Sequence, residues 1–186
     1  SFDVLGGFSA YSFASHDFNL SGKGYMDDAI LWNNMNAVQD KETYSAGTSY
    51  SKKTKTSVYA RLNYNWKSRY YLTVTGRYDG ASNFAANNKW AFFPSAALKW
   101  NISNENFLKD CNWIDDLSLR LSAGLTGNDA ISTYRSLATL SSTTGGYLFD
   151  GSQPVAFYRS RLDSPDLTWE KTTAYNVAID WSMFKG

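Results

Sequence analysis

The chain has 186 residues, a net charge of +1, 17% aromatic residues and 19% charged residues, against roughly 25% charged residues in typical globular domains. Because the charge is nearly neutral and no basic patch accompanies the aromatics, a nucleic-acid partner is excluded. No apolar run approaches the roughly 20 residues of a membrane helix, and one cysteine, Cys111, excludes an internal disulfide framework and a multi-cysteine metal site.

Alternation of apolar and polar residues predicts six β-strands in chain order. Their ranges are about 2–13, 57–66, 70–79, 90–102, 117–126 and 169–183. The fifth shows the pattern most clearly, since Leu119 and Leu121 alternate with Ser118 and Arg120 and give one apolar and one polar face. Pro94 lies inside the fourth strand and cannot donate a ladder hydrogen bond, so we expect a bulge or a strand end there.

The connections between these strands differ in length. Two of those that follow odd-numbered strands are long, residues 14–56 and 127–168, and they flank a shorter third one at residues 80–89. Those that follow even-numbered strands are compact: residues 67–69 and 103–116. Long loops on one side and short turns on the other are typical of outer-membrane barrels, so we expect odd strands to run outward. We also expect a short helix at 26–35, capped by Asp27 or Asp28, and a helical turn at 105–109.

Strand alternation alone leaves both a soluble β-sandwich and a transmembrane β-barrel open. Each predicted strand, however, reaches the roughly 9 to 11 residues that a tilted membrane strand requires. Five aromatics also fall on the apolar faces near the short turns, where an interfacial belt would lie: Tyr64, Trp66, Tyr70, Trp100 and Trp181. The sequence therefore favours an all-β, antiparallel transmembrane β-barrel segment with long extracellular loops. The alternative is a soluble β-sandwich module that binds glycans.

Several ordered motifs then resemble one family. Five segments are similar to the barrel of SusC/RagA-type TonB-dependent outer-membrane transporters. They are Arg69-Tyr70-Tyr71-Leu72, Gly76-Arg77-Tyr78-Asp79-Gly80-Ala81-Ser82-Asn83-Phe84, Trp90-Ala91-Phe92-Phe93-Pro94-Ser95, the run from Trp113 to Asn128, and Asp166-Leu167-Thr168-Trp169-Glu170-Lys171-Thr172. Ala81 and Asn83 depart from the pattern, because family members commonly carry Ser and Arg there.

The resemblance implies a 22-stranded barrel, of which residues 1–186 supply about six strands, the plug and the rest of the barrel being absent. Because the chain starts at Ser1 without a signal peptide, we interpret it as an excised piece. The family's function is TonB-dependent import of an oligosaccharide or peptide across the outer membrane of a Gram-negative bacterium. The implied partners are a SusD-type surface lipoprotein, the TonB complex reached through an absent N-terminal region, and the lipid bilayer.

No enzyme, cofactor or metal site is predicted. The only histidine, His16, has no metal-binding spacing around it, and the acidic pairs Asp27-Asp28 and Asp115-Asp116 are explained by capping and turns. Four charged residues are predicted to face the lumen, for plug packing, cross-strand ion pairing or a polar path: Arg77, Lys99, Arg120 and Asp180. Five residues of the long loops are candidates for substrate or lid contacts: Trp32, Tyr44, Tyr147, Tyr158 and Arg159.

Overall fold

The computed structural model describes residues 1–25, 33–108, 113–144, 151 and 154–183. None of the helices within these ranges has the length and apolar character that crossing a membrane requires.

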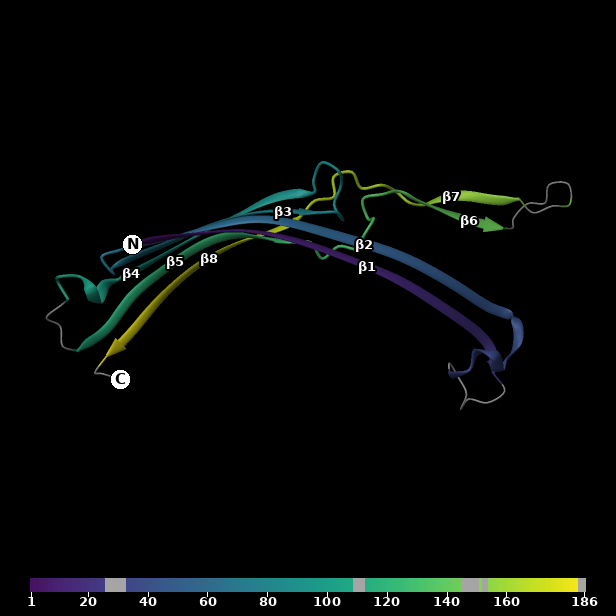
Figure 1. Cartoon of the computed structure of the whole chain (residues 1–186), viewed down its shortest axis with the longest axis horizontal. Helices are drawn as coiled ribbons and strands as arrows, with labels where there is room; N and C mark the ends of the chain where they lie inside the picture. Colours follow the sequence, from purple (N-terminus) through teal and green to yellow (C-terminus); the bar gives the residue numbers. More distant parts are fainter. Residues whose placement is uncertain (26–32, 109–112, 145–150, 152–153, 184–186) are drawn as a thin grey trace. The chain divides into compact units, whose positions relative to one another are not determined.

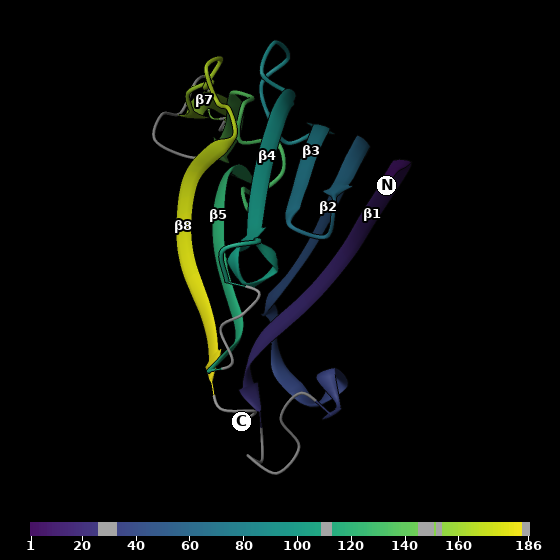
Figure 2. The same ribbon diagram turned by 90° about the vertical axis from the view of Figure 1, so that its left-hand side faces the viewer.

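Six strands form one sheet and two more form a separate hairpin (Figure 1). The large sheet contains β1 (Phe2–Tyr25), β2 (Val38–Trp66), β3 (Tyr70–Ala81), β4 (Trp90–Asn101), β5 (Ile114–Asn128) and β8 (Glu170–Met183), in that order across the sheet (Figure 2). The hairpin pairs β6 (Thr139–Thr144) with β7 (Val155–Arg161). The short 3-10 helices are η2 (Met35–Ala37) and η3 (Ile102–Asn104). All pairings with a defined register are antiparallel, which confirms the predicted fold class.

Two compact units divide the chain: Ser1–Tyr11 together with Thr54–Gly186, and Ser12–Lys53. The second unit is a two-stranded ribbon built from the later part of β1 and the earlier part of β2. Within it, the rings of His16 and Tyr50 lie 4.5 Å apart and the backbone N–H of Lys23 donates to a Thr43 side chain. The prediction of a loop over residues 14–56 is therefore wrong for most of its length, because these residues pair across the ribbon.

The predicted loop over residues 127–168 is also wrong in part, since it contains β6 and β7. Most of the helix expected at 26–35 lies outside the described residues, and Met35 begins η2, where Asn34 accepts a bond from the Asn36 N–H at 3.1 Å. The turn expected at 105–109 is confirmed as far as Leu108, whose N–H donates to the carbonyl of Glu105 at 3.1 Å. Residue 109 lies outside the described residues.

Pro94 does not end β4. It pairs in regular register with Gly76 of β3, so the predicted bulge or strand end is wrong for this strand. The register with β5 nevertheless starts only at Ser95, opposite Gly124. Pro94 has no backbone N–H to donate, and it lies just outside the part of β4 that pairs with β5, so the sheet tolerates it there.

Cross-strand registers align side chains of one kind across five strands. One row of register partners reads Trp66, Tyr70, Trp100, Leu119 and Ile179; the next reads Tyr64, Leu72, Leu98, Leu121 and Val177. Seven of these ten side chains are exposed, from 37% for Leu72 to 73% for Val177, and Tyr70, Trp100 and Leu119 are half-buried. Within the described residues, no second layer covers this apolar face, so the two-layer core of a β-sandwich is not formed.

Aromatic residues mark both ends of the apolar face. At the short-turn end Tyr70 lies 5.5 Å from Trp66 and 6.2 Å from Trp100, measured between ring centroids. At the other end Tyr78 and Trp90 stack at 5.0 Å. Residue 80 of β3 pairs with Trp90, and β3 is about 33 Å long from residue 70 to residue 80. At a strand tilt of roughly 40° this length spans a height of about 25 Å, which equals the height of the apolar band of outer-membrane barrels.

A small core lies at the loop end of the sheet. Phe84 and Phe93 surround Trp169, with ring centroids 4.8 Å and 5.3 Å from it, and Trp169 is only 3% exposed. The Trp169 indole N–H donates to the Lys89 carbonyl at 3.0 Å, and the buried Asn83 amide donates to two carbonyls of residues 129 and 131. This core therefore ties the β3–β4 loop to both ends of the β5–β8 connection.

Glu105 joins the compact turns at the opposite end. Its carboxylate accepts hydrogen bonds from Tyr70 at 2.8 Å, Trp100 at 3.2 Å and Arg69 at 2.9 Å. The Tyr70 bond is the main cause that lowers the pKa of Glu105 below the ordinary 4.5; the Trp100 bond and the Arg69 charge act in the same direction, while desolvation opposes them. The Tyr70 hydroxyl and the Trp100 indole N–H, two polar groups of the aromatic belt, are thus held by one carboxylate outside the apolar band.

Candidate functional site

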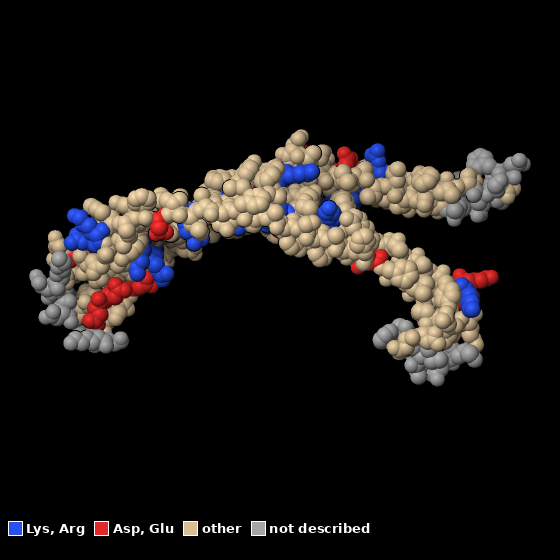
Figure 3. All heavy atoms as spheres, viewed as in Figure 1, with Lys and Arg blue, Asp and Glu red and all other residues tan. Residues whose placement is uncertain are grey.

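The face opposite the apolar rows carries polar and charged side chains, because successive residues of a strand point to opposite sides. One row of register partners reads Asn65, Tyr71, Lys99, Arg120 and Ala178; the next reads Asn63, Thr73, Ala97, Ser122 and Asn176. Space-filling shows charged residues as small separate groups among mostly uncharged ones (Figure 3). Of the ten residues in these two rows, only Lys99 and Arg120 are charged, so most of this part of the face is uncharged.

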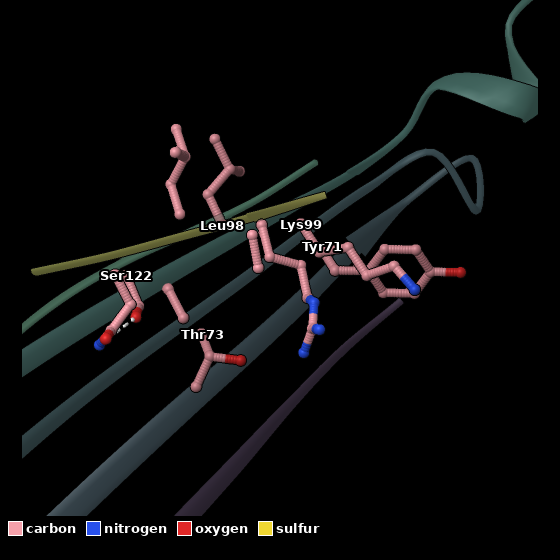
Figure 4. Close-up of a pocket in the computed structure, with 10 residues that line it drawn as sticks. Tyr71, Thr73, Leu98, Lys99 and Ser122 are labelled. Atoms are coloured by element: carbon pink, nitrogen blue, oxygen red, sulfur yellow. Dashed lines mark hydrogen bonds between the residues drawn. The ribbon is translucent and has the colours of Figure 1, made fainter. Parts of the chain in front are cut away.

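A pocket of about 240 Å³ lies on this face over β3, β4, β5 and β8. Tyr71, Thr73, Lys99 and Ser122 line it, and Leu98 points to the opposite side of the strands (Figure 4). We call it the polar-face pocket. Its remaining members are Ala97, Leu98, Arg120, Leu121, Asn176 and Ala178.

Two of the four predicted lumen-facing charges, Lys99 and Arg120, line this pocket, and a third, Asp180, is the ion-pair partner of Arg120. Lys99 and Arg120 are direct register partners on β4 and β5. The Arg120 guanidinium donates to the Asp180 carboxylate of β8 at 2.7 Å, and Ser118 donates to the same carboxylate at 3.2 Å. The carboxylate of Asp180 is therefore engaged by one cation and one hydroxyl.

Arg77 lies apart from that group, because its register partner on β4 is Phe93 rather than Lys99. Its guanidinium contacts the buried Asp79 carboxylate at 2.7 Å and donates to the Ser57 hydroxyl at 2.9 Å. It also lies 5.6 Å from the ring centre of Tyr59. Arg77 is thus held within the wall by neighbours on β2 and β3.

The five residues predicted to contact substrate or lid from the long loops lie in different parts of the structure. Tyr44 lies on β2 and its hydroxyl donates to the Met35 carbonyl at 2.5 Å. Tyr158 and Arg159 lie on β7, where cross-strand pairing holds their backbone, and both are exposed. These three residues are therefore on strands and not on flexible loops. Trp32 and Tyr147 lie outside the described residues.

Tyr71, Ser122 and Asn176 belong to the polar-face pocket but escape a search of the sequence for charge or catalytic motifs. Asn176 donates to the Ser122 hydroxyl at 3.3 Å. The signal that could have found them is strand phase, since each shares the parity of Lys99, Arg120 or Asp180 on its own or a paired strand. Among the described residues, no group of three His, Cys, Asp or Glu side chains converges as a metal site would require.

Comparisons with known proteins agree with this arrangement. Residues 2–186 match a family model described as TonB dependent receptor-like, beta-barrel. TonB-dependent receptor P3 of Formosa agariphila is 35% identical over 183 residues, covering 97% of this chain and 18% of that protein. TonB-dependent receptor SusC of Bacteroides thetaiotaomicron is 40% identical over 143 residues, covering 75% of this chain and 14% of SusC.

Solved structures give the same result. A structure of the RagAB peptide transporter superimposes with a TM-score of 0.82 and 26% identity, covering 98% of this chain and 20% of that chain. A RagAB peptide importer in an open-open state gives a TM-score of 0.81 over the same share of this chain. The chain thus spans about a fifth or less of the length of these relatives. It belongs to the TonB-dependent receptor-like β-barrel family and is of the SusC/RagA type.

Proposed function

We propose that this chain forms part of the barrel wall of a TonB-dependent importer in the outer membrane of a Gram-negative bacterium. The observation that carries the proposal is the pair of unlike faces in one sheet. An exposed apolar face ends at aromatic residues on both sides, at a spacing that fits the hydrocarbon layer, and a polar face lies opposite. Lipid would cover the first face, and the pore would lie along the second.

The strand connections support an orientation for this wall segment. The β2–β3 turn is short, whereas β1–β2 forms a long ribbon and β5–β8 carries the β6–β7 hairpin. We place the ribbon and the hairpin on the extracellular side. We propose that Tyr158 and Arg159, which are exposed on β7, contact a SusD-type lipoprotein or the solute there.

The solute class follows from the relatives and is part of the proposal. RagAB is named as a peptide transporter, and SusC as a TonB-dependent receptor. We infer import of a peptide or an oligosaccharide, driven by the TonB complex through a segment elsewhere in the full-length protein. The wall would act by transport, without bond chemistry.

Deletion of the full-length gene in its own host tests this function. The strain should lose uptake of labelled peptides or oligosaccharides, and a protonophore should abolish uptake in the parent strain because TonB coupling draws on the inner-membrane gradient. A strain carrying the gene with its TonB-interacting segment removed provides the matched control. Unchanged uptake of every peptide and oligosaccharide tried, or fractionation of the protein away from the outer membrane, would contradict the proposal.

A further inference from the structure

Lys99 differs from Arg120, the other charged residue that lines the polar-face pocket, because no carboxylate of the described residues lies within ion-pair distance of its amine. Arg120 has the Asp180 carboxylate at 2.7 Å, and Arg77, farther along the wall, has Asp79 at 2.7 Å. In the described part of the chain Lys99 makes no ion pair. Its side chain is nevertheless half-buried between Tyr71 and Arg120, its register partners on either side.

The position of Lys99 opposite Arg120 has an energetic consequence. Like charges directly opposite on an antiparallel pair destabilise a sheet. Asp180, the ion-pair partner of Arg120, supplies one negative charge against the two positive charges of Lys99 and Arg120, so these three residues carry a net charge of +1. An additional anion between Lys99 and Arg120 would remove this repulsion.

The pocket also has the donors that a carboxylate needs. Ammonium and guanidinium groups form charge-assisted hydrogen bonds with carboxylate oxygens, and Arg120 retains guanidinium N–H groups beyond its bond to Asp180. Tyr71 and Thr73 add hydroxyl groups to the lining. A volume of about 240 Å³ lies below the roughly 300–1,000 Å³ of sites that enclose a drug-sized ligand, so it suits one group of a larger molecule.

We propose that Lys99 and Arg120 form a carboxylate-binding site on the pore side of the wall. The inference rests on the proposed function, which places this face along the pore. The carboxylate comes either from an acidic side chain of another segment of the full-length protein or from the solute in transit. Both sources share one chemistry, and the experiment separates them.

Zero-length crosslinking of the full-length transporter, purified in detergent, tests the site. A carbodiimide activates a carboxylate, the Lys99 amine attacks it, and an amide bond forms as the urea by-product leaves. Mass spectrometry of the digested protein then shows what Lys99 has joined. Lys67, an exposed lysine on the β2–β3 turn, is the internal control and should remain unlinked.

Two outcomes support the site and two count against it. A link from Lys99 to a peptide of the same chain other than the one that contains Asp180 identifies a protein segment as the source, whereas a link to Asp180 alone would count against the proposal. A link that appears only after addition of a tetrapeptide with a free C-terminus, and not of its C-terminal amide, identifies the solute. If Lys99 forms neither link and is acetylated as fast as Lys67, the proposal fails; a held carboxylate should slow acetylation at least about tenfold.

Variants separate this site from the importer function. Lys99→Arg should lose the crosslink, because a guanidinium does not react, and keep uptake; Lys99→Met should lose both. Lys67→Met removes the same charge from the turn and should change neither. Normal uptake by Lys99→Met would contradict the site and leave the importer standing, whereas a link at Lys99 in a protein without uptake would contradict only the importer.

Discussion

Removal of the Trp169 side chain should loosen the β5–β8 connection without unfolding the sheet. Trp169 is 3% exposed, lies within 5.3 Å of two phenylalanine rings and donates to the Lys89 carbonyl. Truncation of a buried tryptophan to alanine costs about 3–5 kcal/mol, since contacts are lost and a cavity remains. At 1.4 kcal/mol per factor of ten, Trp169→Ala should raise the open population of the connection about 140- to 3,700-fold.

Trp169→Phe is the matched variant, because it keeps an apolar ring and removes the indole hydrogen bond together with only part of the ring volume. The Lys89 carbonyl still accepts from the Ala81 N–H at 3.0 Å, so the loss should be about 1 kcal/mol, or roughly fivefold. Hydrogen exchange of the full-length protein should show faster exchange at residues 129–131 and 164–167 and unchanged exchange in the middle of β4 and β5. Equal exchange in the two variants, or faster exchange throughout the sheet, would refute the role assigned to this core.

Three further predictions concern the faces and the turn end. Val74→Arg, near the middle of the apolar face, should destabilise the membrane-inserted protein by about 2–4 kcal/mol, whereas Thr73→Arg on the polar face should have a much smaller effect; folded yield in lipid vesicles checks both. Gly127→Val should overlap the Phe93 ring and cost about 1–3 kcal/mol, while Gly6→Ala, with open space around it, should cost less; urea titration would compare them. Glu105 has a lowered pKa, so its contribution to stability is present above 4.5 and is lost as the pH falls from 4.5 through the lower folded value. Tryptophan fluorescence at the turn end should follow that loss in the parent protein and stay flat in Glu105→Gln.

The positions of the strands in the apolar band were predictable from the sequence, because the two faces of the sheet are in different environments and carry different kinds of side chain. Leu119 and Arg120 of β5 belong to opposite faces, and this contrast appears directly as alternation in the sequence. The ribbon at Ser12–Lys53 gives no such signal. His16, Phe18 and Tyr50 are interspersed with polar residues, and a two-stranded ribbon has no buried face to impose a regular pattern. The same reason explains why β6 and β7 were missed.

The site was predictable in part. Strand parity places Arg77, Lys99, Arg120 and Asp180 on the polar face, but parity does not say which of them meet. Register decides that, and it depends on the lengths of the connections: Lys99 lies opposite Arg120, whereas Arg77 lies opposite Phe93. A shift by two residues between β4 and β5 would preserve every face and still separate Lys99 from Arg120.

The motifs that carry the family resemblance gain a physical explanation from the loop-end core. Asn83-Phe84 and Leu167-Thr168-Trp169 lie far apart in the sequence, and the Ala85 N–H donates to the Leu167 carbonyl at 3.1 Å. Asn83 reaches across to residues 129 and 131 with its amide, although family members commonly carry arginine at this position. A long arginine would have to place a buried charge where this chain places a neutral amide. In this chain the Asn83 amide therefore holds the base of the β5–β8 connection, and Phe84 and Trp169 make the aromatic contact that joins the two motifs.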